Sequence, residues 1–259
     1  NVPDARLEKL EELVHPERVQ PATVEIVDIA GLVKGASKGE GLGNQFLGNI
    51  RECHAIIHVL RCFDNDNIVH VEGSVDPIRD KETIDIELQL KDLETVEKRL
   101  EKVTRAAKAG DKVAQKELAL LGRYREALLK GISARAVELS EEEQELSQSY
   151  QLLTAKPILY VCNVDEASAA SGNKYVEAVR EAVKNENAQV IVLAVATEAD
   201  IAELETYEER QLFLQDMGLG EPGASVLIRA AYRLLNLQTY FTAGVKEVRA
   251  WTIPVGATA

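Results

Sequence analysis

Cysteine is scarce in this chain, and the few that occur have no paired spacing. The 259 residues hold three cysteines, Cys53, Cys62 and Cys162, with no C-x-x-C motif. An odd number in separate apolar neighbourhoods argues against a disulfide framework and against a zinc site. We therefore expect buried, reduced thiols in a cytoplasmic protein.

Long hydrophobic runs and a leader-like start are also missing. No run approaches the roughly 18 apolar positions that a membrane-spanning helix needs. Residues 1–4 lack the basic start and apolar core of a signal peptide. We expect a soluble globular protein with no membrane partner. Because the only methionine is Met217, we also expect a piece of a longer protein, truncated at both ends.

Positive charge is in short supply overall. Thirty Lys and Arg stand against 43 Asp and Glu, a net charge of −13, which repels polyanions and argues against a nucleic-acid coat protein. Between Lys98 and Arg135, however, eleven basic residues stand against four acids. This local surplus fits a docking surface for RNA or another anionic partner, and it equally fits the solvated face of a helix.

Short apolar segments rich in β-branched residues alternate with helical patterns. The predicted strands are 23–28, 55–63, 157–163 and 189–195, and the predicted helices between and after them are 44–52, 174–184, 208–217 and 224–235. This alternation predicts an α/β fold with a doubly wound parallel sheet, in which ligands bind at the carboxyl ends of the strands.

The middle third of the chain breaks the alternation. Apolar residues three or four positions apart between 86 and 107 predict one seam of a long helix. Gly110 then interrupts the pattern, and a second amphipathic helix over 113–128 is expected to return antiparallel. Ser140 with Glu143 predicts a capping box at the start of a third helix.

An apolar segment that runs into Asp-x-x-Gly is the most informative motif. Residues 24–27 lead to Asp28, and Gly31 follows three positions later. In P-loop NTPases, a carboxylate at such a strand end holds the Mg²⁺ shell, and the glycine lets a backbone N–H approach the terminal phosphate. The glycine-rich loop that follows, 31–43, could become ordered around a γ-phosphate. A strand that ends in an ordinary turn would show the same four residues.

A second turn, Asn163-Val164-Asp165-Glu166, follows another predicted strand. Guanine-specific switch proteins have Asn-Lys-x-Asp there, and the aspartate accepts two hydrogen bonds from guanine. The longer Glu166 cannot take the same bidentate position, so guanine should lose roughly 1–3 kcal/mol and adenine becomes the favoured base. A polar turn that caps the next helix would look the same.

The residue after Asp-x-x-Gly is Leu32, which can neither donate nor accept a hydrogen bond. Many GTPases orient the attacking water with a glutamine at that position. His70 lies in a polar loop after the second predicted strand and is our candidate for orienting or activating water. We interpret His54 and His58 as structural rather than as a metal pair.

Taken together, four segments resemble the YchF/Obg-like ATPase family. They are DIAGLVKGASKGEGLGNQF at 28–46, NIVHV at 67–71, the Asn-x-x-Glu turn at 163–166, and LQTYFTAGVKEVRAWT at 237–252. The resemblance implies a Ras-like P-loop nucleotide domain in two parts, 1–83 and 152–238, with an inserted helical coiled-coil domain at 84–151 and the start of a β-rich TGS domain at 239–259.

The resemblance also implies an activity. It implies an ATPase that uses Mg²⁺, prefers ATP through Asn163 and Glu166, contacts the base through Ala194 and Val195, and uses His70 as the catalytic group. It further implies a monomer that associates with the large ribosomal subunit.

One departure from the family keeps a second hypothesis open. The phosphate-binding motif Gly-x-x-x-x-Gly-Lys-Ser/Thr occurs nowhere in these residues. Without its N–H groups and lysine, these 259 residues alone should bind ATP weakly. The alternative is a non-catalytic module that binds RNA or protein, in which nucleotide is irrelevant.

Overall fold

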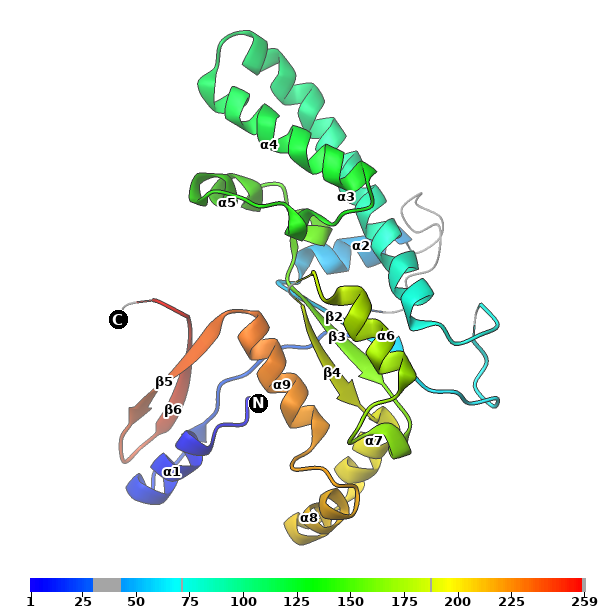
Figure 1. Ribbon diagram of the computed structural model, residues 1–259. Coiled ribbons are helices and arrows are strands. Elements are labelled where there is room, and N and C mark those ends of the chain that lie inside the picture. Colours follow the sequence, from blue (N-terminus) through cyan, green and yellow to red (C-terminus); the bar gives the residue numbers. More distant parts are fainter. Residues whose placement is uncertain (30–42, 71, 187, 258–259) are drawn as a thin grey trace. The chain divides into compact units, whose positions relative to one another are not determined.

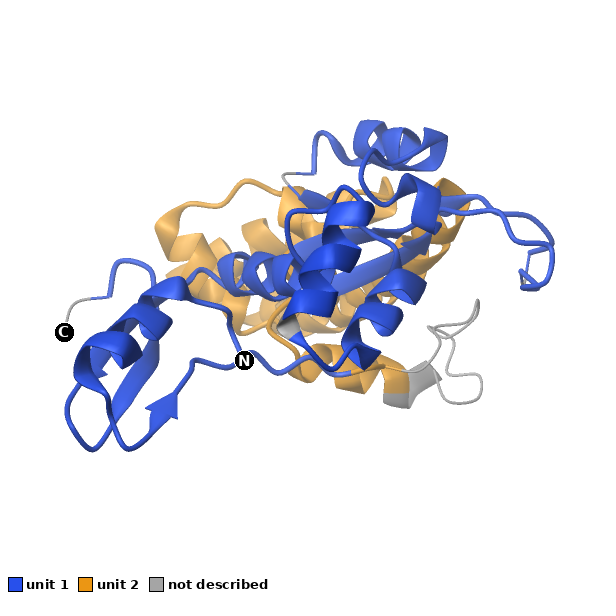
Figure 2. Ribbon diagram, turned by 90° about the horizontal axis from the view of Figure 1, so that it is seen from below, with its two compact units in different colours: residues 1–27, 57–77, 158–259 blue, residues 28–56, 78–157 orange. Residues whose placement is uncertain are grey.

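The computed structural model describes residues 1–29, 43–70, 72–186 and 188–257, and these fold into two compact units. The first unit comprises 1–27, 57–77 and 158–259, and the second comprises 28–56 and 78–157 (Figure 2).

The first unit contains a three-stranded sheet in the order β2 (Ile56–Arg61), β3 (Ile158–Asn163), β4 (Gln189–Leu193) (Figure 1). Strands β3 and β4 are parallel, with Asn163 opposite Leu193. The Cys62 N–H donates to the Asn163 carbonyl at 2.7 Å, which aligns the ends of β2 and β3. The sheet confirms three predicted strands, and it brings their carboxyl ends to one edge.

Helices cover both faces of this sheet. Helix α9 (Gly223–Leu234) packs its Val226 and Ala230 against Leu159 and Val161 of β3. Tyr160 points to the opposite face, where its hydroxyl donates to Glu186 just beyond α6 (Lys174–Val183) at 2.7 Å. The doubly wound arrangement is therefore confirmed. The helices α7 (Val195–Glu203) and α8 (Tyr207–Asp216) lie between β4 and α9 in the chain.

The predicted strand at 23–28 is wrong in this structure. No strand is assigned between residues 21 and 29, and Ile26 and Val27 are 52% and 55% exposed. A strand requires a neighbouring strand for its N–H and C=O groups as well as an apolar sequence. Within the described residues this segment has no such neighbour, so it is not part of a sheet.

A second sheet lies near the two ends of the chain, also within the first unit. Its order is β1 (Val19–Gln20), β6 (Val248–Pro254), β5 (Leu237–Ala243), with β5 and β6 antiparallel. Helix α1 (Ala5–Val14) packs its Leu7 into a core with Tyr232 and Val248. The hairpin confirms the strand-like alternation near the end of the sequence.

The second unit is helical. It contains α2 (Gly43–Glu52), nearly all of α3 (Pro77–Lys108), α4 (Lys112–Leu129) and α5 (Glu141–Gln148). Gly110 joins α3 to α4 with φ +92°, a conformation that glycine adopts without strain. The predicted capping box is present, because Ser140 and Glu143 bond each other's backbone N–H. The antiparallel helix pair is confirmed (Figure 1).

The first half of the predicted α3 seam is wrong. Ile86 and Leu90 are exposed, whereas Leu88 and Asp92 are buried. This half of α3 packs against α2 and the turn at Leu153 rather than against α4, so it presents a different face. Helix α4 covers α3 only from residue 93 onward, where the seam holds.

The cysteine prediction is confirmed in part. None of the three cysteines forms a disulfide, and Cys62 and Cys162 are fully buried, but Cys53 is only partly buried. None of the described helices combines the length and the apolar character needed to cross a membrane.

Candidate functional site

The carboxyl edge of the β2-β3-β4 sheet gathers most of the predicted site residues that the structure describes. The loop after β2 carries His70, the turn after β3 begins at Asn163, and β4 runs into Ala194 and Val195. Because parallel strands end at the same edge, these three connections belong to one rim.

The Asn163 side chain joins the ends of β3 and β4. Its carboxamide oxygen accepts a hydrogen bond from the Val195 N–H at 3.1 Å, and the Val164 N–H donates to the Leu193 carbonyl at 2.9 Å. The first bond assigns the oxygen of the amide, since a backbone N–H requires an acceptor. Among the described residues the Asn163 Nδ2 group has no partner, so both of its N–H groups remain available to a ligand.

Of the residues next to Asn163 at this rim, some are buried beneath the turn and others are exposed on its surface. Val164 is 3% exposed and Ala194 is buried, so their side chains lie beneath the turn rather than on its surface. Glu166 begins a short 3₁₀ turn and is exposed. Sequence reasoning missed Asp165, whose carboxylate accepts the Ser168 N–H at 2.9 Å and holds the turn in shape. The Asp-x-x-Ser spacing was an available sign of this cap.

Arg61 was also missed, although it organises the loop that leads to His70. Its guanidinium donates to the carbonyls of Phe63, Asn65 and Ile68 at 3.2, 3.1 and 2.9 Å. The same group lies 4.8 Å from the centre of the Phe63 ring. A charged residue at the end of an otherwise apolar strand was the available signal.

The orientation of His70 limits the chemistry it can perform. Its Nδ1 accepts a hydrogen bond from the Glu72 N–H at 3.1 Å, and its carbonyl accepts from the Gly73 N–H at 3.0 Å. A neutral imidazole with an accepting Nδ1 carries its proton on Nε2. This tautomer favours hydrogen-bond donation by Nε2–H over proton abstraction.

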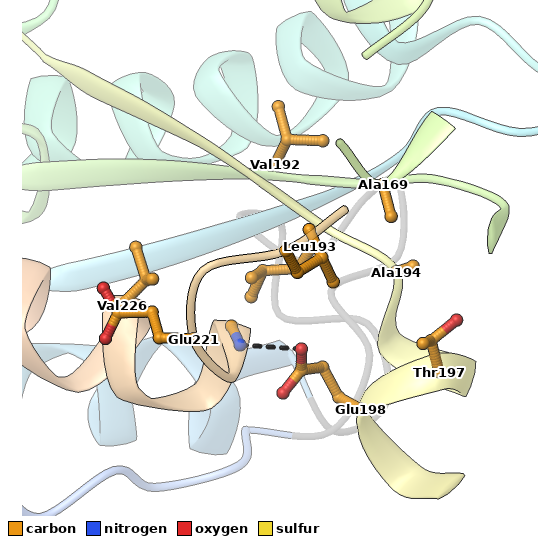
Figure 3. A pocket seen from close by; sticks show the side chains of 10 residues that line it. Ala169, Val192, Leu193, Ala194, Thr197, Glu198, Glu221 and Val226 are labelled. Atoms are coloured by element: carbon orange, nitrogen blue, oxygen red, sulfur yellow. Dashed lines mark hydrogen bonds between the residues drawn. The ribbon is translucent and has the colours of Figure 1, made fainter. Parts of the chain in front are cut away.

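Glu198 links α7 to the start of α9 (Figure 3). Its carboxylate accepts from the N–H groups of Gly223 and Ala224 at 2.7 and 3.0 Å, a favourable position for an anion at a helix N-terminus. A Cβ on Gly223 would lie 2.3 Å from Leu193 Cδ2, so only glycine fits there. The cavity beside these residues measures about 80 Å³, below the roughly 300–1,000 Å³ of ligand pockets.

A larger hollow of about 350 Å³ lies between the loops after β2 and β3. Asp64 and Asp165 line it, with Lys174 as the only basic residue among its lining residues. The Tyr175 hydroxyl donates a hydrogen bond to the Asp64 carboxylate at 2.7 Å, and both residues line the hollow. The excess of carboxylates makes this hollow unsuitable for a triphosphate.

The switch motif is only partly within the described residues. Asp28 is exposed and belongs to the second unit, whereas Gly31, Leu32 and the glycine-rich loop through Gly41 lie outside the described residues. The described residues contain no cluster of three acids, histidines or cysteines that could hold a metal. A single carboxylate still suits Mg²⁺, which binds one or two protein carboxylates together with phosphates and water. Convergence of Asp28 with Asn163 on one crevice stays a prediction.

Known proteins match the whole chain. The "Ribosome-binding ATPase YchF" of Escherichia coli O157:H7 is 56% identical over 258 residues, which cover 100% of this chain and 70% of that protein. The protein of the same name from Bacillus subtilis is 54% identical over 257 residues, 98% of this chain and 70% of its own length. The chain belongs to the YchF family.

Two further comparisons agree with membership of the YchF family. The solved structure of the Schizosaccharomyces pombe YchF GTPase covers 100% of this chain and 70% of its own, with a TM-score of 0.88 and 37% identity. A family model described as "50S ribosome-binding GTPase" matches residues 8–113. The predicted P-loop α/β fold is therefore confirmed. The two bacterial YchF relatives are named ATPases and the yeast one a GTPase.

Proposed function

We propose that this protein is a P-loop switch that binds ATP in preference to GTP, hydrolyses it slowly and associates with the ribosome. It binds and hydrolyses a nucleoside triphosphate, as the ATPase names of its bacterial relatives state for them. The observation that carries the choice of site is the Asn163–Val195 hydrogen bond, which leaves the Nδ2 donors of Asn163 at the rim of the sheet.

The base is assigned to the turn after β3. Asn163 donates from Nδ2 to the purine, Ala194 and Val195 contribute their backbone, and buried Val164 supports the turn from below. Glu166 stands where guanine-specific proteins have aspartate, and its longer side chain cannot make the same bidentate contact with guanine. Selectivity for ATP follows from this mismatch.

The phosphates are assigned to the switch motif. Asp28 would hold Mg²⁺, and Gly31 would bring its N–H to the terminal phosphate. When bound, the metal neutralises charge on the phosphates. His70 donates from Nε2–H toward the attacking water or the developing charge. Leu32 cannot orient water, and this accounts for slow turnover.

The partner assignments follow from ribosome association. We assign the large subunit as the site of contact, RNA as the partner of the basic arm from Lys98 to Arg135, and the cytoplasm as the location. We assign residues 84–151 to an inserted coiled-coil domain and 239–259 to the start of a TGS domain, in a monomeric protein.

Titration of the full-length protein with ATP and GTP tests the base assignment. We expect ATP to bind about 5- to 150-fold more tightly than GTP, the equivalent of roughly 1–3 kcal/mol. Glu166→Asp should recover much of the GTP affinity, because the shorter carboxylate can reach both guanine donors. Equal binding of ATP and GTP by the parent protein would refute the assignment, and binding of neither would favour the non-catalytic module.

Substitution of His70 tests the hydrolysis assignment. His70→Ala should remove most turnover and leave ATP affinity nearly unchanged. His70→Gln keeps an N–H donor and should retain more activity than the alanine variant. Parallel loss of affinity and turnover would show a structural role instead.

A further inference from the structure

The structure divides the basic arm into two sets of cations. Six of the eleven form ion pairs within the second unit: Lys98–Glu94, Arg99–Glu117, Lys116–Glu142, Arg123–Glu143, Arg125–Glu97 and Lys130–Glu126. A seventh, Arg135, donates to the Lys156 carbonyl at 3.1 Å. These seven are accounted for by contacts within the unit.

The remaining four, Lys102, Arg105, Lys108 and Lys112, we call the tip cluster. All are exposed, and in the part of the chain that the structure describes none has an acidic partner or a side-chain hydrogen bond. They occupy the last two turns of α3 and the first residue of α4, at the free end of this helical hairpin (Figure 1). The segment from 102 to 112 holds four basic residues and one acid.

That single acid is already engaged. Asp111 caps α4, and its carboxylate accepts the N–H groups of Val113 and Ala114 at 2.9 and 3.1 Å. Its charge is therefore directed toward the helix end rather than toward a neighbouring cation. The hairpin tip has a net charge of +3 over these eleven residues in a chain of net charge −13.

Helix stability explains only part of the tip cluster. Lys102, Arg105 and Lys108 lie near the C-terminus of α3, where positive charge interacts favourably with the helix dipole. Lys112 is the first residue of α4, where the same dipole disfavours a cation. The helix dipole therefore does not explain the fourth charge, which leaves Lys112 available to a partner outside the helices.

We propose that the tip cluster binds the phosphodiester backbone of RNA. The three α3 cations repeat every third residue and so form one stripe about 9 Å long, suited to a row of phosphates. An acidic protein surface fits less well, because protein interfaces centre on aromatic and apolar residues. The segment 102–112 has no aromatic residue, its one large apolar side chain, Val103, is buried, and Val113 just beyond it is 66% exposed. The inference rests on the proposed ribosome association and refines it to four side chains.

Two matched variants of the full-length protein test the proposal. The tip variant carries Lys102→Gln, Arg105→Gln, Lys108→Gln and Lys112→Gln. The control carries Lys98→Gln, Lys116→Gln, Arg125→Gln and Lys130→Gln, the same change of charge at four exposed, ion-paired positions of the same helices. Binding to ribosomes, and to protein-free RNA extracted from them, is measured across a range of salt concentrations.

We expect the tip variant to lose tenfold or more in affinity for both probes. The slope of log affinity against log salt should flatten by about 3 to 4, one counterion term for each lost phosphate contact. The control should stay within about twofold of the parent. Unchanged binding of the tip variant, or an equal loss in the control, would overturn the proposal.

Two further readouts separate the possible failures. Loss of ribosome binding without loss of RNA binding would identify an acidic protein partner and overturn the assignment to RNA. ATP affinity and turnover should be the same in both variants and the parent. If the parent itself failed to bind ribosomes or ATP, the proposed function would fall, and the protein-free RNA would still decide the tip cluster by itself.

Discussion

The carboxamide oxygen of Asn163 accepts the backbone N–H of Val195 at 3.1 Å, which ties the end of β3 to the start of α7. One atom of this side chain is thus used within the protein, and its Nδ2 donors are left for a ligand. If the proposed base contact is made by Nδ2, substitutions of Asn163 can separate it from the hydrogen bond to Val195.

Asn163→Asp should lose nucleotide affinity while keeping stability. Aspartate can still accept the Val195 N–H, but it replaces the amide donors with a second acceptor. We expect ATP affinity to fall by at least tenfold, with thermal unfolding close to that of the parent. Asn163→Ala removes both functions and should lower both quantities. Unimpaired ATP binding by Asn163→Asp would contradict a role for Nδ2 in base recognition.

Arg61→Lys should slow hydrolysis without weakening ATP binding. A lysine cannot span the three carbonyls that the guanidinium holds, so the loop before His70 should lose its fixed shape. We expect kcat to fall severalfold or more at unchanged KM. Arg180→Lys, on an exposed Arg–Glu pair of α6, is the control and should match the parent. Unchanged kcat in Arg61→Lys would show that the loop does not depend on this side chain.

Gly223→Ala should destabilise the first unit. The new Cβ would lie 2.3 Å from Leu193 Cδ2 and 2.7 Å from Glu198 Oε1, so the strand end or the helix cap must shift. We expect a loss of about 1–3 kcal/mol in the free energy of unfolding, measured in urea. Gly220→Ala meets no atom within 4 Å and should change this free energy by less than about 0.5 kcal/mol. Equal stability of the two variants would argue against a tight fit at Gly223.

Asp92→Asn should destabilise the second unit. The buried carboxylate accepts the N–H groups of Leu153 and Thr154 and the Thr154 hydroxyl, each at 2.7 Å. An asparagine amide would point a donor at one of these donors, at a cost of about 1–3 kcal/mol in the free energy of unfolding. Glu94→Gln is the control. Two lysines lower the pKa of Glu94 to about 2, yet its exposure to solvent should keep the change below about 1 kcal/mol.

The contribution of Asp92 to the free energy of unfolding should also depend on pH. Burial raises the pKa of this carboxyl above 3.8, although the hydrogen bonds from Thr154 and Leu153 oppose the rise. The folded state therefore holds the proton more tightly than the unfolded state. The stabilising contribution is complete below about pH 3.8 and declines as pH rises through the folded pKa. The difference in the free energy of unfolding between the parent and Asp92→Asn should therefore narrow as pH rises over that range. A difference that widens would contradict a raised pKa of Asp92.

The sequence was a good guide wherever structure depends on near neighbours. Three of the four predicted strands formed, and the capping box at Ser140 is present. Helix periodicity, caps and buried strands are set within a few residues of the chain. The motif at 163–166 predicts a base-binding turn from residues that are adjacent in the chain, and this role stays a prediction.

Local sequence patterns did not predict contacts between residues that are distant in the chain. The segment 23–28 has an apolar sequence but no neighbouring strand in the part of the chain that the structure describes. The first half of α3 turns a different face inward because α2 covers it. Three further features depend on the tertiary structure. They are the ion pairs of the basic arm, the hydrogen bonds from Arg61 to its loop, and the tautomer of His70. Local order follows from short-range sterics and hydrogen bonding, whereas pairing, burial and tautomer depend on groups that only tertiary folding brings together.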